Sequence, residues 1–166
     1  PLGRGRAEGE ALAGSHIGYT VVHALAAKKQ DAHVYAFEPV NYLYELSRKN
    51  IALQSTLQNT FQSSGGATLE KKALGERTGV AEIKIDGVRS SLAPDPKLQH
   101  MPSETVEVVS IDAYTQEKNI DHVDFIFLDV EGYEFTALKG CVSRVFPQAK
   151  LPEIIFEIAP SAMAAV

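Results

Sequence analysis

The chain has 166 residues, of which 45% are apolar and 22% are charged, and this balance suits one globular domain with a sizeable core. Its formal net charge of −5 argues against a nucleic-acid partner, and no apolar run approaches the length of a membrane span. The single cysteine, Cys141, excludes an internal disulfide.

The first ten residues, PLGRGRAEGE, are rich in glycine and charge, so we expect residues 1–10 to be a disordered or non-core leader. Residues 11–166 are predicted to form the domain, and we expect it to be incomplete at both ends. No apolar segment of signal-peptide type is present, and the default location is therefore the cytoplasm.

Segments with helical periodicity alternate with short apolar segments through the rest of the chain. Apolar spacing predicts helices over residues 17–29, 40–53, 111–117 and 133–146. Strand-favouring residues predict strands at 33–38, 67–74, 80–85, 105–109, 123–128 and 153–158. Polar stretches predict loops at 54–66 and 86–102. This alternation favours an α/β sandwich with a mostly parallel sheet.

The apolar stripes also predict which helix faces are buried. For the helix over residues 40–53, the stripe consists of Tyr42, Leu43, Leu46, Asn50 and Leu53. For the helix over residues 133–146, it consists of Phe135, Leu138, Val142 and Val145. Ser110 is predicted to cap the helix that begins at Ile111.

Three polar or glycine-rich sites follow predicted strands or precede predicted helices. They are the turn GSHIG at 14–18, the acid Glu38 and the segment DVEG at 129–132. Ligands of open α/β sheets bind beyond the carboxyl ends of the strands. We therefore expect the three sites to meet at one rim of the sheet.

Glu38 is the acid around which this prediction is built. It ends the apolar strand HVYAF, and Pro39 directly after it cannot continue a strand ladder. It also lies twenty positions after Gly18, which is the layout of a nucleoside-binding βαβ unit. The predicted role of its carboxylate is to accept hydrogen bonds from ribose hydroxyls.

Each site has a plainer interpretation. The glycines of residues 14–18 could form an ordinary strand-to-helix turn, and Glu38 could be a solvated strand end. Asp129 and Glu131 could simply begin a helix, because acids are favoured there. The histidines show no spacing typical of metal ligands, and no metal site is predicted.

The order of several short motifs resembles the FkbM-type methyltransferase family. They are VYAFEP at 34–39, NIAL at 50–53, ALGE at 73–76, VEVVSID at 106–112, IDHVDFIFLDVEGYE at 120–134, LKG at 138–140 and PEIIFEI at 152–158. The pairing of FEP with LDVEG is the most specific part, and the resemblance covers residues 14–158.

The resemblance implies a Rossmann-like class I fold, S-adenosylmethionine as cofactor, and methyl transfer to a hydroxyl of a small molecule, sugar or lipid. It implies that Gly14, His16 and Gly18 lie beside the methionine part, that Glu38 binds the ribose, and that Pro39 shapes the adjoining turn. It places Ala73 and Leu74 at the adenine edge. Asp129 lies by the methyl group, and Asp129 and Glu131 are the catalytic candidates on the acceptor side.

The chain also departs from that family. Leu12 stands where the family has an acid before the first glycine, and Ser15 and His16 stand in place of the usual asparagine. The first strand and the terminal hairpin of the fold are expected to be missing. A catalytically inactive relative that serves as a binding or interaction module is therefore the alternative. An NAD-dependent oxidoreductase is disfavoured, because GxGxxG is absent.

Overall fold

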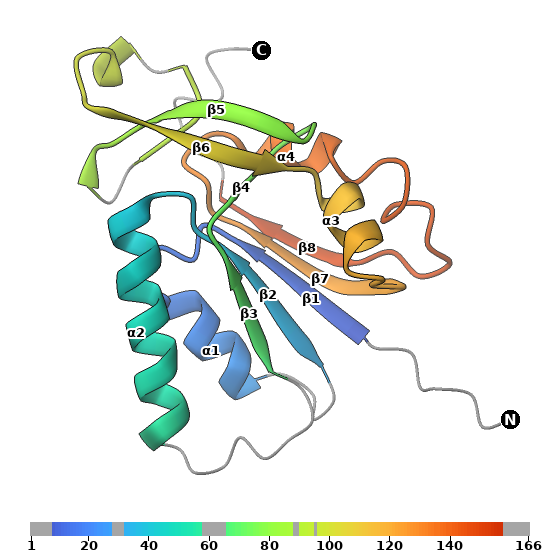
Figure 1. Cartoon of the computed structure of the whole chain (residues 1–166). Coiled ribbons are helices and arrows are strands. Elements are labelled where there is room, and N and C mark those ends of the chain that lie inside the picture. The colour runs from blue at the N-terminus through green and yellow to red at the C-terminus, as the bar shows by residue number, and fades with distance from the viewer. Residues whose placement is uncertain (1–7, 28–31, 58–65, 88–89, 95, 158–166) are drawn as a thin grey trace, which may run out of the picture.

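The computed structural model describes residues 8–27, 32–57, 66–87, 90–94 and 96–157 (Figure 1). Its strands are β1 (Glu8–Ala13), β2 (His33–Phe37), β3 (Ala67–Glu70), β4 (Ala73–Leu74), β5 (Gly79–Lys84), β6 (Ser103–Val109), β7 (His122–Leu128) and β8 (Glu153–Phe156). Its helices are α1 (Tyr19–Ala27), α2 (Asn41–Leu57), α3 (Ile111–Glu117) and α4 (Glu134–Lys139), with a short 3₁₀ turn, η2 (Pro96–Leu98). The predicted mixed α/β fold is confirmed, and none of the described helices is long and apolar enough to cross a membrane.

The larger sheet has five strands in the order β3-β2-β1-β7-β8, and all neighbouring strands run parallel. The chain moves outward from β1 through β2 to β3, and later returns to the other side of β1 with β7 and β8 (Figure 1). The order therefore reverses between β1 and β7. Such a switch point is where ligands bind in open α/β sheets.

Successive side chains of a strand point to opposite faces of the sheet. Apolar residues therefore occur on both faces of the larger sheet, and helices pack against both. On one face, Val34 and Ala36 of β2 form a buried cluster with Val21 of α1. On the other, Phe37 packs in a cluster with Tyr114 of α3 and Ala137 of α4. The aromatic rings of Phe37 and Tyr114 meet edge to face at a centroid distance of 4.8 Å.

A second, smaller sheet has the order β4-β6-β5, with β4 parallel and β5 antiparallel to β6. Its buried residues Ala73, Ile83 and Val106 pack against Val40 and Leu43 at the start of α2. The prediction of one strand over residues 67–74 is wrong in this respect, because β3 belongs to the larger sheet and β4 to the smaller one. The alternation of apolar and polar side chains predicts which face of a strand is buried, but it does not predict which sheet the strand joins.

The expectation that the first strand is missing is also wrong. β1 forms the centre of the larger sheet, with Ala13 opposite Phe37 on one side and Leu128 on the other. Residues 8–10, which were predicted to belong to the leader, are part of it. Backbone pairing with two neighbours outweighs the low strand propensity of this glycine- and glutamate-containing segment. Residues 1–7 of the leader, and residues 158–166 where the missing hairpin was predicted, lie outside the described residues.

The predicted helices differ from the observed ones at their ends and faces. α3 has the predicted bounds, and the Ser110 hydroxyl caps it by accepting the Ala113 N–H at 3.2 Å. α2 extends to Leu57, into the predicted loop, and Ser47 lies on its buried face. The predicted stripe is wrong for three of its members, which are exposed: Tyr42, Leu46 and Leu53.

The helix predicted over residues 133–146 ends at Lys139 and is followed by turns. Asp112 explains the change, because its carboxylate accepts the backbone N–H groups of Ser143 at 2.6 Å and Val145 at 2.9 Å. These N–H groups are therefore drawn away from a helical ladder. Two members of the predicted stripe are exposed, Phe135 within α4 and Val142 in the turns that follow it.

Candidate functional site

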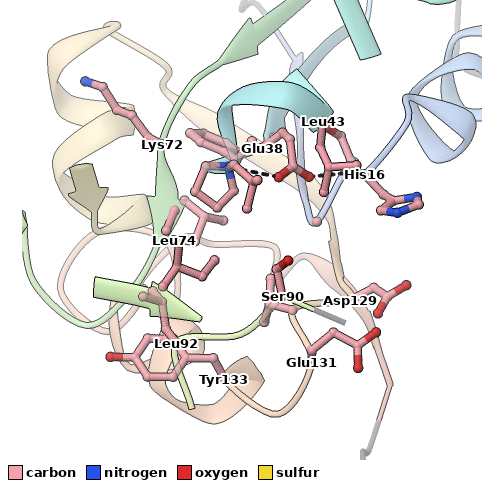
Figure 2. A pocket seen from close by; sticks show the side chains of 18 of the residues that line it. His16, Glu38, Leu43, Lys72, Leu74, Ser90, Leu92, Asp129, Glu131 and Tyr133 are labelled. Carbon is pink, nitrogen blue, oxygen red and sulfur yellow. Dashed lines mark hydrogen bonds between the residues drawn. The ribbon is translucent and has the colours of Figure 1, made fainter. Parts of the chain in front are cut away.

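The three sites predicted to share one rim surround a single cavity of about 320 Å³ (Figure 2). Gly14 follows β1, Glu38 follows β2 and Asp129 follows β7, and all three line the cavity. They meet because the carboxyl ends of parallel strands lie at the same edge of the sheet. The volume is in the range of small-molecule sites.

Glu38 is only 4% exposed, yet its carboxylate is well supplied with hydrogen bonds. Oε2 accepts the backbone N–H of His16 at 2.8 Å, and Oε1 accepts that of Val40 at 3.0 Å (Figure 2). Burial raises the pKa of Glu38 to about 7; the two backbone donors oppose this rise, and the charge of Glu104 adds to it. The carboxylate thus links the glycine turn to the start of α2, and its remaining lone pairs can serve a ligand.

The two glycines of the GSHIG turn are required for different reasons. Gly14 has φ +69°, and a Cβ there would overlap the carbonyl oxygen of Asp129. The close approach that excludes a side chain is therefore between the ends of β1 and β7. Gly18 has φ +85° and lies against Ser47 of α2; it is not among the residues that line the cavity.

Ser15 and His16, directly after Gly14, each carry a buried polar atom without a partner in the part of the chain that the structure describes. Ser15 is 1% exposed, and neither its hydroxyl nor Nε2 of His16 has a hydrogen-bond partner among the described residues. Both residues line the cavity, and His16 is held at φ +49°. A buried hydroxyl without a partner is costly, so these atoms indicate a polar ligand that pairs with them.

The acid loop, residues 129–132, leaves β7 through two residues with positive φ. Glu131 has φ +52° and Gly132 has φ +94°. Glu134, which is 2% exposed, fixes the loop, because its Oε1 accepts the N–H groups of Val130 and Gly132, both at 3.1 Å. Glu134 thus fixes the loop before α4, while Glu131 lines the cavity.

Asp129 is half-buried in the cavity wall, and its pKa is raised above the ordinary range. Burial is the largest cause, followed by the charge of Glu157, a hydrogen bond with its carboxyl group and the charge of Glu134. Glu157 directly follows β8, and its N–H donates to the Leu128 carbonyl at 3.1 Å, which places it beside Asp129. A carboxylate with a raised pKa is a stronger base than an ordinary one.

Apolar residues also line the cavity. They include Pro39, Ala73 and Leu74, and Ala73 and Leu74 are buried. The sequence interpretation did not identify several other lining residues: Leu43, Lys72, Ile83, Ser90, Leu92 and Tyr133. They come from α2, from the turn between β3 and β4, from β5 and the loop after it, and from the segment after β7, and only the tertiary fold brings these together. Figure 2 shows Lys72 and Leu74 at one end of the group and Asp129 and Glu131 at the other.

Among the residues that the structure describes, no group of three or more His, Cys, Asp or Glu side chains could hold a metal ion. His33, one of the histidines without metal-ligand spacing, forms a hydrogen bond through Nε2 with the Thr68 hydroxyl at 2.8 Å.

A parallel sheet with a cavity beyond the carboxyl ends of its strands, at the switch point between β1 and β7, defines an α/β protein with a candidate ligand site. Comparison with protein families specifies the class further. Residues 13–164 match the methyltransferase FkbM domain, so the chain belongs to the FkbM methyltransferase family. Membership of a methyltransferase family implies dependence on S-adenosylmethionine.

A solved structure supports the fold. The crystal structure of methyltransferase FkbM from Methylobacillus flagellatus KT superimposes with a TM-score of 0.57 at 20% sequence identity. The match covers 93% of this chain but 34% of the other, so the chain spans about a third of that protein's length. Comparison with curated protein sequences gives no significant match.

Proposed function

We propose that this chain is a Rossmann-like class I methyltransferase domain that binds S-adenosylmethionine in the cavity and methylates a hydroxyl of a small molecule, sugar or lipid. The observation that carries the proposal is the meeting of Gly14, Glu38 and Asp129 around one cavity at the switch point. Family membership supports the reaction class. When bound, S-adenosylmethionine supplies a methyl group activated by a sulfonium.

The residues present fit this cofactor. Glu38 would accept the ribose hydroxyls with lone pairs that the N–H groups of His16 and Val40 leave available. Charge-assisted bonds of this kind contribute about 1.5–3 kcal/mol each. The apolar residues Pro39, Ala73 and Leu74 would receive the adenine.

The amino-acid part of the cofactor would lie along the glycine turn. The unpaired Ser15 hydroxyl and Nε2 of His16 are suited to its ammonium and carboxylate. Gly14 would lie beside this part, because it lines the cavity. Gly18 would support the turn through its contact with Ser47 and not through the ligand.

Asp129 is the proposed base for the acceptor hydroxyl. Methyl transfer forms an O–CH₃ bond, breaks the S–CH₃ bond and releases the hydroxyl proton, which the Asp129 carboxylate can accept. Its raised pKa makes it a stronger base than an ordinary aspartate. Glu131, at the same end of the cavity, would orient the acceptor (Figure 2).

The test is isothermal titration calorimetry with S-adenosylhomocysteine. We expect the wild type to bind it and Glu38→Ala to bind it at least tenfold more weakly, because the ribose loses its charged acceptor. Glu82→Ala is the control, since Glu82 is an exposed acid of β5 that does not line the cavity and is not among the groups that shift the pKa of Glu38. Absence of binding to the wild type at millimolar ligand would reject the proposal for this chain.

The alternative is a catalytically inactive relative that serves as a binding or interaction module. Leu12, at the position of the acid expected before Gly14, favours it. A chain that binds S-adenosylhomocysteine but transfers no methyl group to any of a panel of hydroxyl acceptors would support this alternative.

A further inference from the structure

Ser91 connects two walls of the cavity through one buried hydroxyl. The residue is 4% exposed, and its Oγ donates to the backbone carbonyl of Glu131 at 2.7 Å. The same Oγ accepts the N–H of Ala93 at 2.9 Å. Its backbone pairs with Lys84 at the end of β5 in both directions, each at 3.0 Å. Ser91 is therefore fixed to the smaller sheet independently of its contact with Glu131.

The group that Ser91 holds is in a conformation that needs support. Glu131 has φ +52°, a backbone conformation that costs free energy for any residue with a side chain. Such a conformation persists only when its surroundings determine it, and it is common at functional sites. Glu134 takes the N–H groups on either side of Glu131, and Ser91 takes its carbonyl. The two contacts together hold the acid loop from both sides.

Residues on both sides of this contact face the cavity. Ser90 and Leu92 flank Ser91 and line the cavity, as do Asp129 and Glu131 (Figure 2). The hydrogen bond from Ser91 thus sets the position of the acid loop relative to the wall built on the smaller sheet. Nothing in the local sequence around residue 91 indicates this link.

We propose that Ser91 is a positioning residue for methyl transfer, which holds the Glu131 carbonyl and thereby keeps the carboxylates of Asp129 and Glu131 directed at the reacting sulfonium and acceptor. The proposal rests on the proposed function. It differs from a purely structural role in one measurable respect: carboxylates held beside the sulfonium favour the positively charged S-adenosylmethionine over the uncharged thioether of S-adenosylhomocysteine.

The experiment measures the ratio of the dissociation constants of S-adenosylhomocysteine and S-adenosylmethionine by calorimetry. We expect a wild-type ratio above about three and a ratio at least threefold lower in Ser91→Ala, because the acid loop keeps its contacts with Glu134 but loses the one that fixes the Glu131 carbonyl. Ser91→Cys, which keeps the size but donates a weaker hydrogen bond, should change the ratio in the same direction and serves if Ser91→Ala does not fold.

Ser110→Ala is the matched control. Ser110 is also buried and also holds a backbone group, but it caps α3, and neither it nor the residues beside it line the cavity. Its substitution should lower stability and leave the ratio unchanged. A wild-type preference that both Ser91 variants retain would overturn the role of Ser91 alone. A wild type that binds neither ligand would reject the proposed function, and the role of Ser91 with it.

Discussion

At the scale of single residues, Glu38 combines a functional role with a cost in stability. A carboxylate that is 4% exposed has lost most of its hydration, and two backbone N–H groups replace only part of it. The raised pKa of Glu38 is the measure of this deficit. The position of this acid was predictable from the sequence, because strand, acid and proline occur in direct succession. Its degree of burial was not, because α2 and the glycine turn close over it only in the fold.

The first prediction concerns pH. Because the pKa of Glu38 is about 7 in the folded chain and 4.5 ordinarily, the folded state holds this proton more tightly than the unfolded state. The stability it contributes is complete below pH 4.5 and is lost as the pH rises through about 7. Relative to Glu38→Gln, the wild type should lose roughly 3 kcal/mol of unfolding free energy over this range.

Urea denaturation of the wild type and Glu38→Gln between pH 4.5 and pH 8 measures the difference between their unfolding free energies. The pH dependence that comes from other titrating groups is common to both proteins and cancels in this difference. Affinity for S-adenosylhomocysteine should change in the opposite direction and rise with pH, because the ionised carboxylate is the better acceptor. A difference in unfolding free energy that does not vary with pH would show that Glu38 is ionised in the folded state throughout the range.

At the scale of elements, hydrophobic spacing predicted that helices exist but not how their faces and ends are used. The stripe assigned to α2 includes Tyr42 and Leu46, yet the face that packs closely carries Ser47. A small residue is needed there because Gly18 lies against it, and this requirement is invisible in a pattern of apolar residues. The helix predicted to reach Phe146 ends early because Asp112, far away in the sequence, takes its N–H groups.

The second prediction tests this close contact between α2 and the turn that begins α1. A Cβ at Gly18 would lie 2.9 Å from the Ser47 hydroxyl and 3.2 Å from its Cα, and φ is +85°. We expect Gly18→Ala to lower the unfolding free energy by about 1–3 kcal/mol, through backbone strain and displacement of α2. Because Gly18 does not line the cavity, affinity for S-adenosylhomocysteine at low temperature should fall less than threefold.

Gly79→Ala is the control, since Gly79 lies in β5 with open space where its Cβ would be. It should change stability by less than 1 kcal/mol. Thermal and urea denaturation of the three proteins distinguish the two positions. Equal stability of Gly18→Ala and Gly79→Ala would show that the turn and α2 can separate at little cost.

At the scale of the whole molecule, the sequence predicted that distant segments meet at one rim but not that two sheets enclose the cavity. Strand ends and chain order are enough to bring Gly14, Glu38 and Asp129 together, because parallel strands point the same way. Residues 67–74 are divided between the sheets because β3 pairs with β2 and β4 pairs with β6. β1 likewise forms because it pairs with β2 and β7. These features belong to pairing across the fold, which no local pattern contains.

The third prediction follows from this enclosure. The cavity is lined by Asp129 after β7 of the larger sheet and by Ile83 of β5 in the smaller one, so a ligand should bind only when both sheets are in place. S-adenosylhomocysteine at about 100 times its dissociation constant should then stabilise the fold by about 2.7 kcal/mol. Hydrogen exchange of the slowest amides in β6 and in β7 should slow by the same factor, about 100, because both exchange only when the cavity is lost. Slowing in β7 alone would show that the smaller sheet opens with the ligand still bound, and that its residues are not essential walls of the site.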